Sequence, residues 1–370
     1  MDWNQQQSAA LDRVAKWHKS KTKSQQVFKL MGYAGTGKTT LAKYLAEHIK
    51  GDTVFCAFTG KASLVMQRNG CKDASTIHSL IYNVRTDSDT GETHFDLNYD
   101  SDAKRAKLIV VDECSMVDES MGIDLMSFKT PILVLGDPAQ LPPVNGAGYF
   151  VNGRPDSLLT EIHRQAENDP IIQLASKVRA GERLQPGTYG DTKIITRQEV
   201  MQTDVVLADQ VLVGRNVTRE NYNKRIREIN RIESPYPVKG DRLICLRNDR
   251  NLGIFNGGMF EAIKGASPSK NTVHITVKSE DFEDRDPITI ECRKECFTGG
   301  IEDVDWKEKK GLQEFTFGYA VTVHKAQGSQ WDNIYLFDES QAFGRHDPYM
   351  PQRWLYTGIT RAAKRQTIVV

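Results

Sequence analysis

Residues 32–40 read Gly-Tyr-Ala-Gly-Thr-Gly-Lys-Thr-Thr and match the phosphate-binding pattern G-x-x-x-x-G-K-[ST] in full. An apolar, strand-like run precedes this segment at residues 27–31, and leucine and isoleucine side chains recur every fourth residue from 41 to 49. That spacing predicts a helix with one apolar face. The order of strand, loop and helix indicates a nucleoside triphosphate site within a parallel α/β sheet.

Each residue type in this loop suits a phosphate group. Glycines let the backbone curl so that its N–H groups point inward at phosphate oxygens, where a Cβ atom would obstruct them. The lysine reaches the β and γ phosphates, a threonine supplies a hydroxyl for Mg²⁺, and the helix N-terminus faces the same anion. The residues expected to bind ATP are Gly32, Gly35, Thr36, Gly37, Lys38, Thr39 and Thr40, with Thr39 also binding Mg²⁺.

The composition is that of an ordinary globular protein. A chain of 370 residues exceeds what one hydrophobic core usually organises, so two or three subdomains are expected. The formal charge is only +1, so any site for a polyanion must be local. The six cysteines lack the spacing of a zinc site, the N-terminus does not resemble a signal peptide, and no apolar run approaches about 18 residues. We therefore expect a cytoplasmic protein with reduced thiols and no membrane partner.

Apolar runs alternate with helical patterns along much of the chain, as in parallel α/β sheets. The first group of strand-like runs lies at 27–31, 53–58, 108–112 and 132–137. A second parallel sheet is predicted by strand-like runs at 211–213, 316–323 and 367–370 and helical patterns at 171–178 and 217–232. A small antiparallel barrel inserted into that second part is predicted by short β-rich runs at 241–246, 259–263, 272–277 and 287–292.

Two carboxylates follow one another at the end of the strand-like run 108–112. In a nucleotide hydrolase, Asp112 would hold the Mg²⁺ shell, and Glu113 would orient and deprotonate the attacking water. Such a pair is also common at a solvated strand end, but the phosphate loop upstream favours the catalytic interpretation. The next strand leads to Gln140 in a proline-rich turn, where an amide can donate to a γ phosphate and accept from water.

Three segments further along place cations among polar, loop-like residues, at 159–165, 322–329 and 356–361. With the phosphate loop and the acidic pair, they make the chain resemble a superfamily 1 helicase, in particular the RecD-like and Dda-like branch. The resemblance runs from Gln7 to Arg361. It implies two RecA-like domains with ATP between them, and a motor that moves 5′ to 3′ on single-stranded DNA.

The resemblance also implies further nucleotide contacts. Gln7 matches the glutamine that recognises adenine, and Gly328 matches a residue near the γ phosphate. Arg164 and Arg361 match the arginine fingers of the family, whose guanidinium groups neutralise charge on the transferred phosphoryl group. Most arginines form surface ion pairs instead, but the flanking motif residues favour the catalytic interpretation.

The resemblance also implies which residues contact the DNA strand. Hydroxyls, imidazoles and backbone amides hold phosphates without reading bases, which suits a motor that acts on any sequence. The residues implied to contact DNA are Thr59, Lys61 and His78 in the first domain and Thr322, His324 and Lys325 in the second. His78 would also suit a buried structural role among hydroxyls that cap helices.

A hairpin with its tip at residues 88–92 is predicted inside the first domain. The resemblance makes it the pin that separates duplex strands, with Phe95 also among the DNA contacts. Phe95 is expected either to stack on a terminal base pair or to pack beneath the hairpin.

The implied domains are a RecA-like domain at 1–165 with the pin at 82–107, a second RecA-like domain at 166–234 and 313–370, and an SH3-like β-barrel at 235–312. The implied substrates are single-stranded DNA and forked duplex DNA. Single-strand-binding protein and replication or recombination proteins are candidate partners. The alternatives are a DNA-stimulated ATPase that serves as a nucleotide-gated DNA-binding component, an RNA-directed helicase, and a phosphate-loop kinase of small metabolites.

Overall fold

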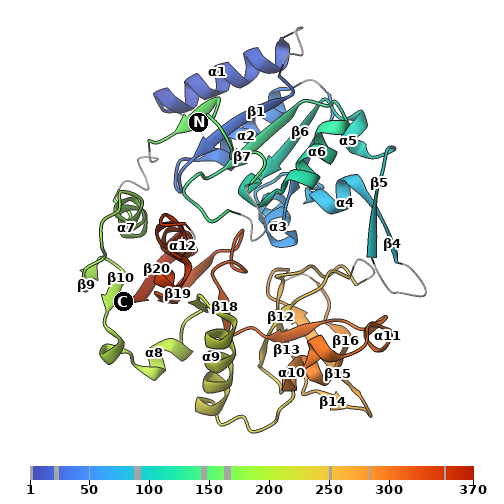
Figure 1. Ribbon diagram of the computed structural model, residues 1–370, viewed down its shortest axis with the longest axis vertical. Helices are drawn as coiled ribbons and strands as arrows, with labels where there is room; N and C mark the ends of the chain where they lie inside the picture. Colours follow the sequence, from blue (N-terminus) through green and yellow to red (C-terminus); the bar gives the residue numbers. More distant parts are fainter. Residues whose placement is uncertain are drawn as a thin grey trace. The chain divides into compact units, whose positions relative to one another are not determined.

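The structure of the protein is a computed structural model. It describes residues 3–20, 25–49, 51–86, 93–142, 148–161, 168–249, 252–282, 285–345 and 347–370. The chain divides into two compact units (Figure 1). The first unit comprises residues 1–85, 94–185 and 343–360, and the second comprises 86–93, 186–342 and 361–370. None of the helices in the described parts is long and apolar enough to cross a membrane.

A parallel sheet forms the centre of the first unit, with the strand order β3-β2-β6-β7-β1-β8. Its strands are β1 (Val27–Gly32), β2 (Thr53–Ala57), β3 (Ser75–Thr76), β6 (Leu108–Asp112), β7 (Ile132–Gly136) and β8 (Ser157–Leu159). The four strands expected here from the sequence are thereby confirmed. The phosphate-binding loop at residues 32–40, called the P loop below, follows β1. Because the strands are parallel, the P loop and the residues that follow β6 and β7 lie at the same edge of the sheet.

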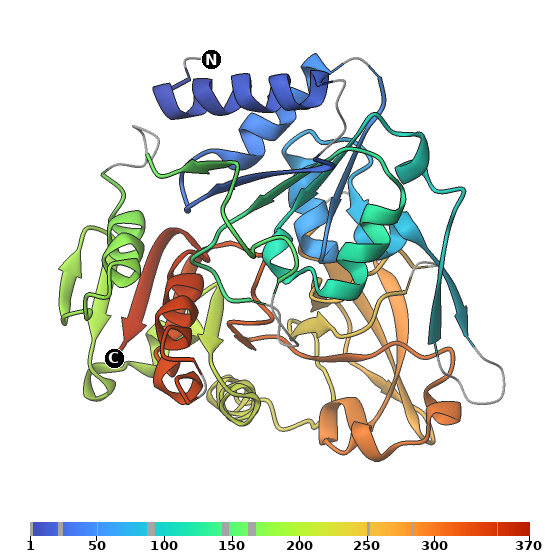
Figure 2. The same ribbon diagram turned by 45° about the horizontal axis from the view of Figure 1, so that its top comes forward.

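Helices cover both faces of this sheet, as Figure 2 shows. Leu108 and Val110 of β6 belong to one apolar cluster, and Ile109 and Val111 belong to the other, so the strand is buried on both sides. The helices of the unit are α1 (Gln5–Lys19), α2 (Lys38–His48), α3 (Gly60–Arg68), α4 (Ile77–Ile81), α5 (Asp102–Arg105), α6 (Glu119–Ser127), α7 (Pro170–Arg179) and α12 (Met350–Ile359). The short 3-10 helix η1 (Cys114–Met116) follows the acidic pair.

Two further strands, β4 (Tyr82–Thr86) and β5 (Thr93–Leu97), pair with each other. They lie within the region where a hairpin was expected. The predicted tip at 88–92 lies outside the described residues.

The second unit contains another largely parallel sheet, with the order β18-β11-β19-β20-β10-β9. Only the β9–β10 pair among these described strands is antiparallel. The strands are β9 (Gly187–Tyr189), β10 (Thr192–Ile195), β11 (Gln210–Val213), β18 (Ala320–Thr322), β19 (Trp331–Phe337) and β20 (Ala362–Val369). The accompanying helices are α8 (Gln202–Val206), α9 (Asn216–Ile229) and the 3-10 helices η2 (Arg197–Glu199) and η4 (Ser340–Phe343). The second parallel sheet is therefore confirmed.

One predicted strand is wrong in its extent. The run 316–323 does not form one strand, because β17 (Phe315–Phe317) and β18 belong to different sheets. The chain passes from one sheet to the other at Gly318, where a Cβ atom would lie 3.0 Å from the backbone carbon of Leu243. Glycine allows this close approach, and apolar composition alone gives no sign of the break.

An antiparallel sheet is inserted between β11 and β18 of the second unit (Figure 1). Its strands run in the order β14-β15-β13-β12-β17, with β16 paired to β15, and enclose their own apolar cluster. They are β12 (Arg242–Cys245), β13 (Met259–Ala262), β14 (Ser267–Pro268), β15 (Thr272–Ser279), β16 (Ile288–Arg293) and β17. The short helices α10 (Glu295–Thr298), η3 (Ile301–Asp303) and α11 (Trp306–Lys309) follow β16.

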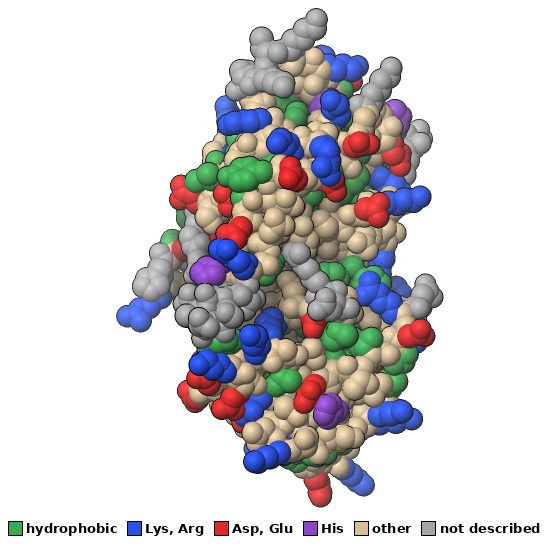
Figure 3. Space-filling view, turned by 90° about the vertical axis from the view of Figure 1, so that its right-hand side faces the viewer, with side chains coloured by type: hydrophobic (Ala, Val, Ile, Leu, Met, Phe, Trp, Pro, Cys, Tyr) green, Lys and Arg blue, Asp and Glu red, His purple; other side chains and the backbone are tan. Residues whose placement is uncertain are grey.

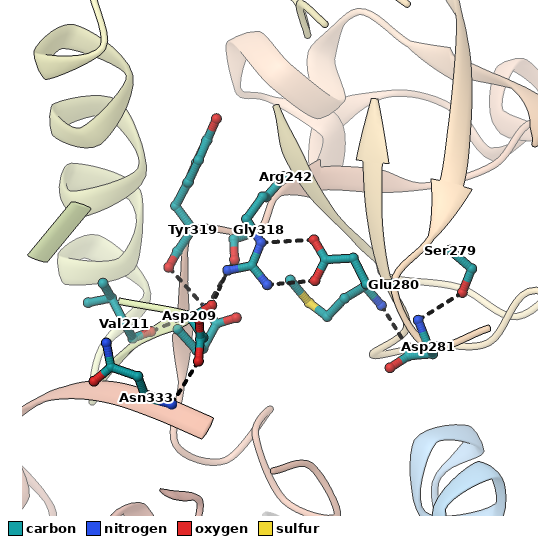
Figure 4. A network of polar contacts seen from close by, with 11 residues as sticks. Asp209, Val211, Arg242, Ser279, Glu280, Asp281, Gly318, Tyr319 and Asn333 are labelled. Atoms are coloured by element: carbon teal, nitrogen blue, oxygen red, sulfur yellow. Dashed lines mark hydrogen bonds and ion pairs between the residues drawn. The ribbon is translucent and has the colours of Figure 1, made fainter. Parts of the chain in front are cut away.

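Arg242 joins the inserted sheet to the parallel sheet of the same unit, as Figure 4 shows. Its Nε and Nη2 donate to the two carboxylate oxygens of Glu280 at 2.9 and 2.7 Å, and its Nη1 donates to the carbonyl oxygen of Asp209. Asp209 precedes β11, and its carboxylate accepts from the backbone N–H of Asn333 in β19 at 2.7 Å. One guanidinium group thus bridges both sheets.

A second ion pair, between Arg227 of α9 and Asp241, is buried beside the first. Its two charge-assisted hydrogen bonds measure 3.2 and 3.1 Å. Asp241 also accepts from the Tyr319 hydroxyl at 2.7 Å and from the Val238 N–H at 2.7 Å. The Arg227 guanidinium lies over the ring of Phe317, 4.0 Å from its centroid. Such complete pairing is what a buried charge requires.

Candidate active site and strand-contact surface

The P loop has the backbone that its glycines predict. Gly35 and Gly37 have φ angles of +77° and +78°, in the left-handed region that favours glycine. A Cβ atom on Gly32 would lie 2.6 Å from Thr36 Oγ1, so this position also requires glycine. Thr36 is fully buried, and its hydroxyl donates to the Tyr33 carbonyl at 2.8 Å. The loop is held in shape by its own residues.

Lys38 begins α2 and folds back over this loop. Its ammonium donates to the carbonyl oxygens of Gly32 at 2.7 Å and Tyr33 at 3.0 Å. Thr39 follows on the same helix, and Thr40 is exposed. The lysine is therefore placed at the mouth of the loop, where a phosphate would meet its positive charge.

The acidic pair lies at the same edge of the sheet. Thr39 Oγ1 donates to Asp112 Oδ2 at 3.0 Å, which brings together the two predicted Mg²⁺ ligands. Burial raises the pKa of Asp112, while the Glu113 N–H, Lys38 and Thr39 oppose that shift. Glu113 has a φ of +51°, an uncommon conformation for a residue with a side chain. The turn that follows β6 thus places the two carboxylates in different backbone settings.

Gln140 lies in the turn after β7 and is 7% exposed. Its Oε1 is buried and has no hydrogen-bond partner within the parts of the chain that the structure describes. A buried acceptor without a partner is costly and calls for a water or a ligand group. The nearby Asp137 organises this turn, because its Oδ1 accepts from the Ala139 N–H at 2.9 Å.

Tyr356 of α12 connects the P loop to this turn. Its hydroxyl donates to Asp137 Oδ2 at 2.6 Å and accepts from the Ala34 N–H at 3.0 Å. The next residue, Thr357, accepts from the Leu141 N–H at 3.0 Å. Neither Tyr356 nor Asp137 was predicted to have a role, although both lie in segments noted from the sequence. Their role depends on contacts between distant segments, which no local pattern indicates.

Gln7 also contacts the loop. It is 1% exposed, and its Nε2 donates to the Thr36 carbonyl at 3.1 Å. Gln7 also completes a capping box at the start of α1, because its Oε1 accepts from the Asn4 N–H at 3.1 Å. The structure therefore places this predicted nucleotide residue directly beside the P loop.

The residues of this edge fit a magnesium nucleotide. The loop offers backbone N–H groups and an ammonium to phosphates, Thr39 and Asp112 offer the oxygen ligands that Mg²⁺ prefers, and Gln140 offers a buried acceptor without a partner. Lys38, Thr39, Asp112, Glu113 and Gln140 all come from the first unit.

In the second unit, two predicted γ-phosphate residues lie near each other. Arg361 is 6% exposed, and its Nη1 donates to the carbonyl oxygen of Ser329 at 3.2 Å. Ser329 directly follows Gly328, which has a φ of +73°. Arg164, the other predicted arginine finger, lies outside the described residues.

The predicted strand contacts of the first unit lie on α3, α4 and the β4–β5 pair. Thr59 caps α3 by accepting from the Ala62 N–H at 3.1 Å, and Lys61 is 7% exposed. His78 is half-buried and lies within 6.0 Å of the Phe58 ring and 5.3 Å of the Phe95 ring, measured between centroids. Phe95 is 50% exposed. It therefore packs on His78 with part of its ring and presents the rest to solvent.

The predicted strand contacts of the second unit follow β18. The Thr322 hydroxyl accepts from the Lys325 N–H at 3.3 Å, which forms a tight turn. Burial lowers the pKa of both His324 and Lys325. The Lys325 ammonium donates to the side-chain oxygen of Asn256 in the inserted sheet. The structure thus brings a predicted strand contact together with Asn256, to which the sequence alone assigns no role.

Acidic and basic side chains are interspersed over the face drawn in Figure 3, in keeping with the formal charge of +1. No broad basic field is needed for nucleic-acid binding if individual cations are well placed.

Comparison with known proteins identifies the family. A family profile described as an AAA domain matches residues 2–199, and one described as a UvrD-like helicase C-terminal domain matches residues 317–369. The ATP-dependent DNA helicase Dda of Enterobacteria phage T4 is 30% identical over 405 residues, with 89% of this chain and 91% of Dda covered. The chain belongs to the RecD-like and Dda-like branch of the superfamily 1 helicases. The resemblance predicted from the motifs is confirmed.

A second relative is considerably longer than this chain. The ATP-dependent RecD2 DNA helicase of Deinococcus radiodurans is 28% identical over 395 residues, which cover 98% of this chain and 48% of RecD2. The chain therefore spans about half the length of that relative. Among solved structures, Pif1 helicase from Bacteroides in complex with ADP-AlF3 and single-stranded DNA superposes with a TM-score of 0.57 at 19% identity, covering 100% of this chain and 92% of Pif1. This likeness shows that the helicase fold is shared.

Proposed function

We propose that this chain is an ATP-dependent DNA helicase, which hydrolyses ATP and translocates 5′ to 3′ on single-stranded DNA to unwind duplex. The observation that carries the proposal is the edge of the first sheet, which bears Lys38, the Thr39–Asp112 pair and Gln140, whose buried Oε1 has no hydrogen-bond partner among the described residues. The relatives named ATP-dependent DNA helicases support it. The direction of movement follows from the resemblance to this branch.

The proposed hydrolysis assigns one task to each side chain. Lys38 exchanges its contacts with loop carbonyls for the β and γ phosphates, and Thr39 and Asp112 are the residues that would hold Mg²⁺. Bound Mg²⁺ supplies positive charge against the phosphate oxygens. Glu113 orients the attacking water and accepts its proton, and Gln140 accepts a hydrogen bond from water while its amide N–H donates to the γ phosphate.

Four further residues complete the proposed nucleotide chemistry. Gln7 recognises the adenine ring, and Gly328 contacts the γ phosphate through its backbone. Arg361 and Arg164 act as arginine fingers that neutralise charge on the transferred phosphoryl group. The buried position of Arg361, whose Nη1 donates to the Ser329 carbonyl directly after Gly328, supports this role.

We propose the same domain organisation that the motifs imply. Residues 1–165 form one RecA-like domain with a pin at 82–107, residues 166–234 and 313–370 form the other, and residues 235–312 form an SH3-like barrel. The exposed half of the Phe95 ring supports its role as a wedge that stacks on the terminal base pair of a fork. Packing against His78 would hold the ring in place.

Single-stranded DNA is the proposed track, and forked duplex is the proposed substrate. Thr59, Lys61 and His78 bind the backbone on one unit, and Thr322, His324 and Lys325 bind it on the other. The proposed setting is the cytoplasm of a bacterium or of a phage-infected cell. Single-strand-binding protein and replication or recombination proteins are the proposed partners there.

ATPase and strand-displacement assays on the same preparation test this proposal. We expect single-stranded DNA to stimulate ATP hydrolysis, and we expect ATP to drive displacement of a tailed duplex strand. Stimulated hydrolysis without any displacement would instead favour a nucleotide-gated DNA-binding component. Hydrolysis that does not respond to DNA would favour a metabolite kinase or another phosphate-loop enzyme. Stronger stimulation of ATP hydrolysis by RNA than by DNA would favour an RNA-directed helicase.

A further inference from the structure

Lys325 is held by a residue from a different sheet. Its ammonium donates to Oδ1 of Asn256, which lies 69 positions away in the sequence. Asn256 stands in the turn between β12 and β13 of the inserted antiparallel sheet, whereas Lys325 follows β18 of the parallel sheet. Both belong to the second unit. The contact therefore joins the inserted sheet to a predicted strand-binding turn.

The turn that carries Asn256 is itself well fixed. The Asn256 N–H donates to the side-chain oxygen of Asn248 at 2.7 Å. The next N–H, of Gly257, donates to the Cys245 carbonyl at 2.8 Å, and Gly257 has a φ of +87°. Asp249 and Ile254, in the same connection between β12 and β13, exchange two backbone hydrogen bonds of 3.0 Å. The carboxamide of Asn256 is thus presented from a preset backbone.

Within the described residues, Lys325 has no carboxylate partner, and its Asn256 partner is neutral. A neutral amide oxygen orients an ammonium without cancelling its charge, unlike the carboxylate of Asp241 opposite Arg227. The other titratable groups that act on Lys325 are the Cys245 thiol and the Arg219 guanidinium of α9. Arg219 is itself paired with Glu220 at 2.9 Å. An oriented, half-buried ammonium opposite a neutral amide suits an anionic ligand.

The Arg242 bridge fixes the inserted sheet, which carries Asn256, relative to the parallel sheet, which carries Lys325. Arg242 ties Glu280 of the inserted sheet to Asp209 at the start of β11 (Figure 4). β11 in turn pairs directly with β18, where Val213 lies opposite Thr322. The inserted sheet and the Thr322–Lys325 turn are therefore held in one frame.

We propose that Asn256 is a positioning residue, which holds the Lys325 ammonium ready to bind a backbone phosphate of single-stranded DNA. This inference rests on the proposed function, because it takes single-stranded DNA as the polyanion. The inserted sheet then contributes to the grip on the strand without touching it. Holding a long side chain in its bound geometry reduces the entropy lost on binding, which is worth roughly 2- to 10-fold in affinity.

The test measures binding of an oligo-dT strand over a series of salt concentrations. Lys325→Ala should weaken binding and reduce the slope of log K against log salt by about 0.7, because one phosphate contact is lost. Asn256→Ala should weaken binding roughly 2- to 10-fold with little change in slope, because the charge remains. Asn256→Asp should reduce the slope as Lys325→Ala does, because its carboxylate neutralises the ammonium. Asn271→Ala, in the β14–β15 turn of the same sheet, is the matched control and should change nothing.

The double variant Asn256→Ala/Lys325→Ala separates a positioning role from a direct one. If Asn256 acts through Lys325, the double variant should bind no more weakly than Lys325→Ala alone. Equal weakening by Asn256→Ala in both backgrounds would overturn the inference. If Lys325→Ala changes neither affinity nor slope, the strand-contact assignment in the proposed function fails too. If Lys325→Ala weakens binding and the Asn256 variants do not, only the inference fails.

Discussion

The phosphate site of the first unit and the strand-contact turn of the second unit are held in different ways. In the first, Lys38 is held by the carbonyl oxygens of the loop, and Thr39 is held by Asp112 at the end of β6. In the second, Lys325 is held by Asn256, which comes from a sheet inserted between two strands. The comparison teaches that local motifs can build a phosphate site, whereas the proposed strand contact of Lys325 is positioned by an insertion that ion pairs dock onto the parallel sheet.

Lys38→Ala should have the largest effect on function, and that effect should be confined to the phosphate site. We expect the kcat of the DNA-stimulated ATPase to fall on the order of 10²- to 10³-fold, because the lysine charge opposes the phosphate charge. Affinity for single-stranded DNA should remain unchanged in a fluorescence anisotropy titration. Lys43→Ala, further along α2, is the control and should retain activity. A matched loss of strand affinity in Lys38→Ala would show that the two regions are not held independently.

Arg227→Met should have the next largest effect, on the stability of the second unit. It removes one partner of a buried pair and leaves Asp241 uncompensated, which costs about 3 kcal/mol. Urea unfolding monitored by tryptophan fluorescence should show a lower midpoint for this variant. Arg225→Met on the same helix is the control, because its pair with Glu228 is exposed and should contribute under about 1 kcal/mol. Equal midpoints for the two variants would mean that the buried pair does not dock the insertion.

Gln140→Ala should lower kcat by roughly 10²-fold while changing the affinity for nucleotide less. In the proposal its amide hydrogen-bonds the attacking water and the γ phosphate, so the substitution should lower the rate of turnover more than the affinity for nucleotide. Steady-state kinetics and nucleotide titration measure the two quantities separately. Gln173→Ala on the exposed face of α7 is the control. An increase in KM alone would assign Gln140 to ground-state binding instead.

Phe95→Ala should have the smallest effect and should uncouple unwinding from hydrolysis. Loss of base stacking worth roughly 1 to 3 kcal/mol should slow displacement of forked duplex, with stimulated ATPase unchanged. Tyr99→Ala, an exposed aromatic just after β5, is the control. If Phe95→Ala unwinds forks as fast as the unchanged protein, the ring packs on His78 and Tyr82 for structural reasons only.

Much of the fold could be predicted because apolar runs and the P loop are local signals. Strands β1, β2, β6 and β7 of the first sheet and helix α9 were predicted near their observed positions, whereas the short edge strands β3 and β8 were not predicted. The break at Gly318 was missed, because it arises from the approach of another strand and not from composition. The domain borders and the closure of the inserted sheet into a barrel remain predictions.

Residues of the candidate site could be predicted only where they belong to a recognisable sequence motif. Thr39 and Asp112, predicted separately, lie in direct contact. Tyr356 and Asn256 were not assigned roles, because each acts through a hydrogen bond to a segment far away in the sequence. Pairing across such distances is determined by tertiary packing, which residue type and spacing do not encode.

The most direct test of the central claim is strand displacement from two partial duplexes of identical sequence, one with a 5′ single-stranded tail and one with a 3′ tail. With ATP and Mg²⁺, the account predicts displacement from the 5′-tailed duplex, little from the 3′-tailed duplex, and none from either with Lys38→Ala. Displacement that requires a 3′ tail would contradict the direction of movement. Displacement by the Lys38→Ala variant at the rate of the unchanged protein would contradict the claim that this P loop drives the motor.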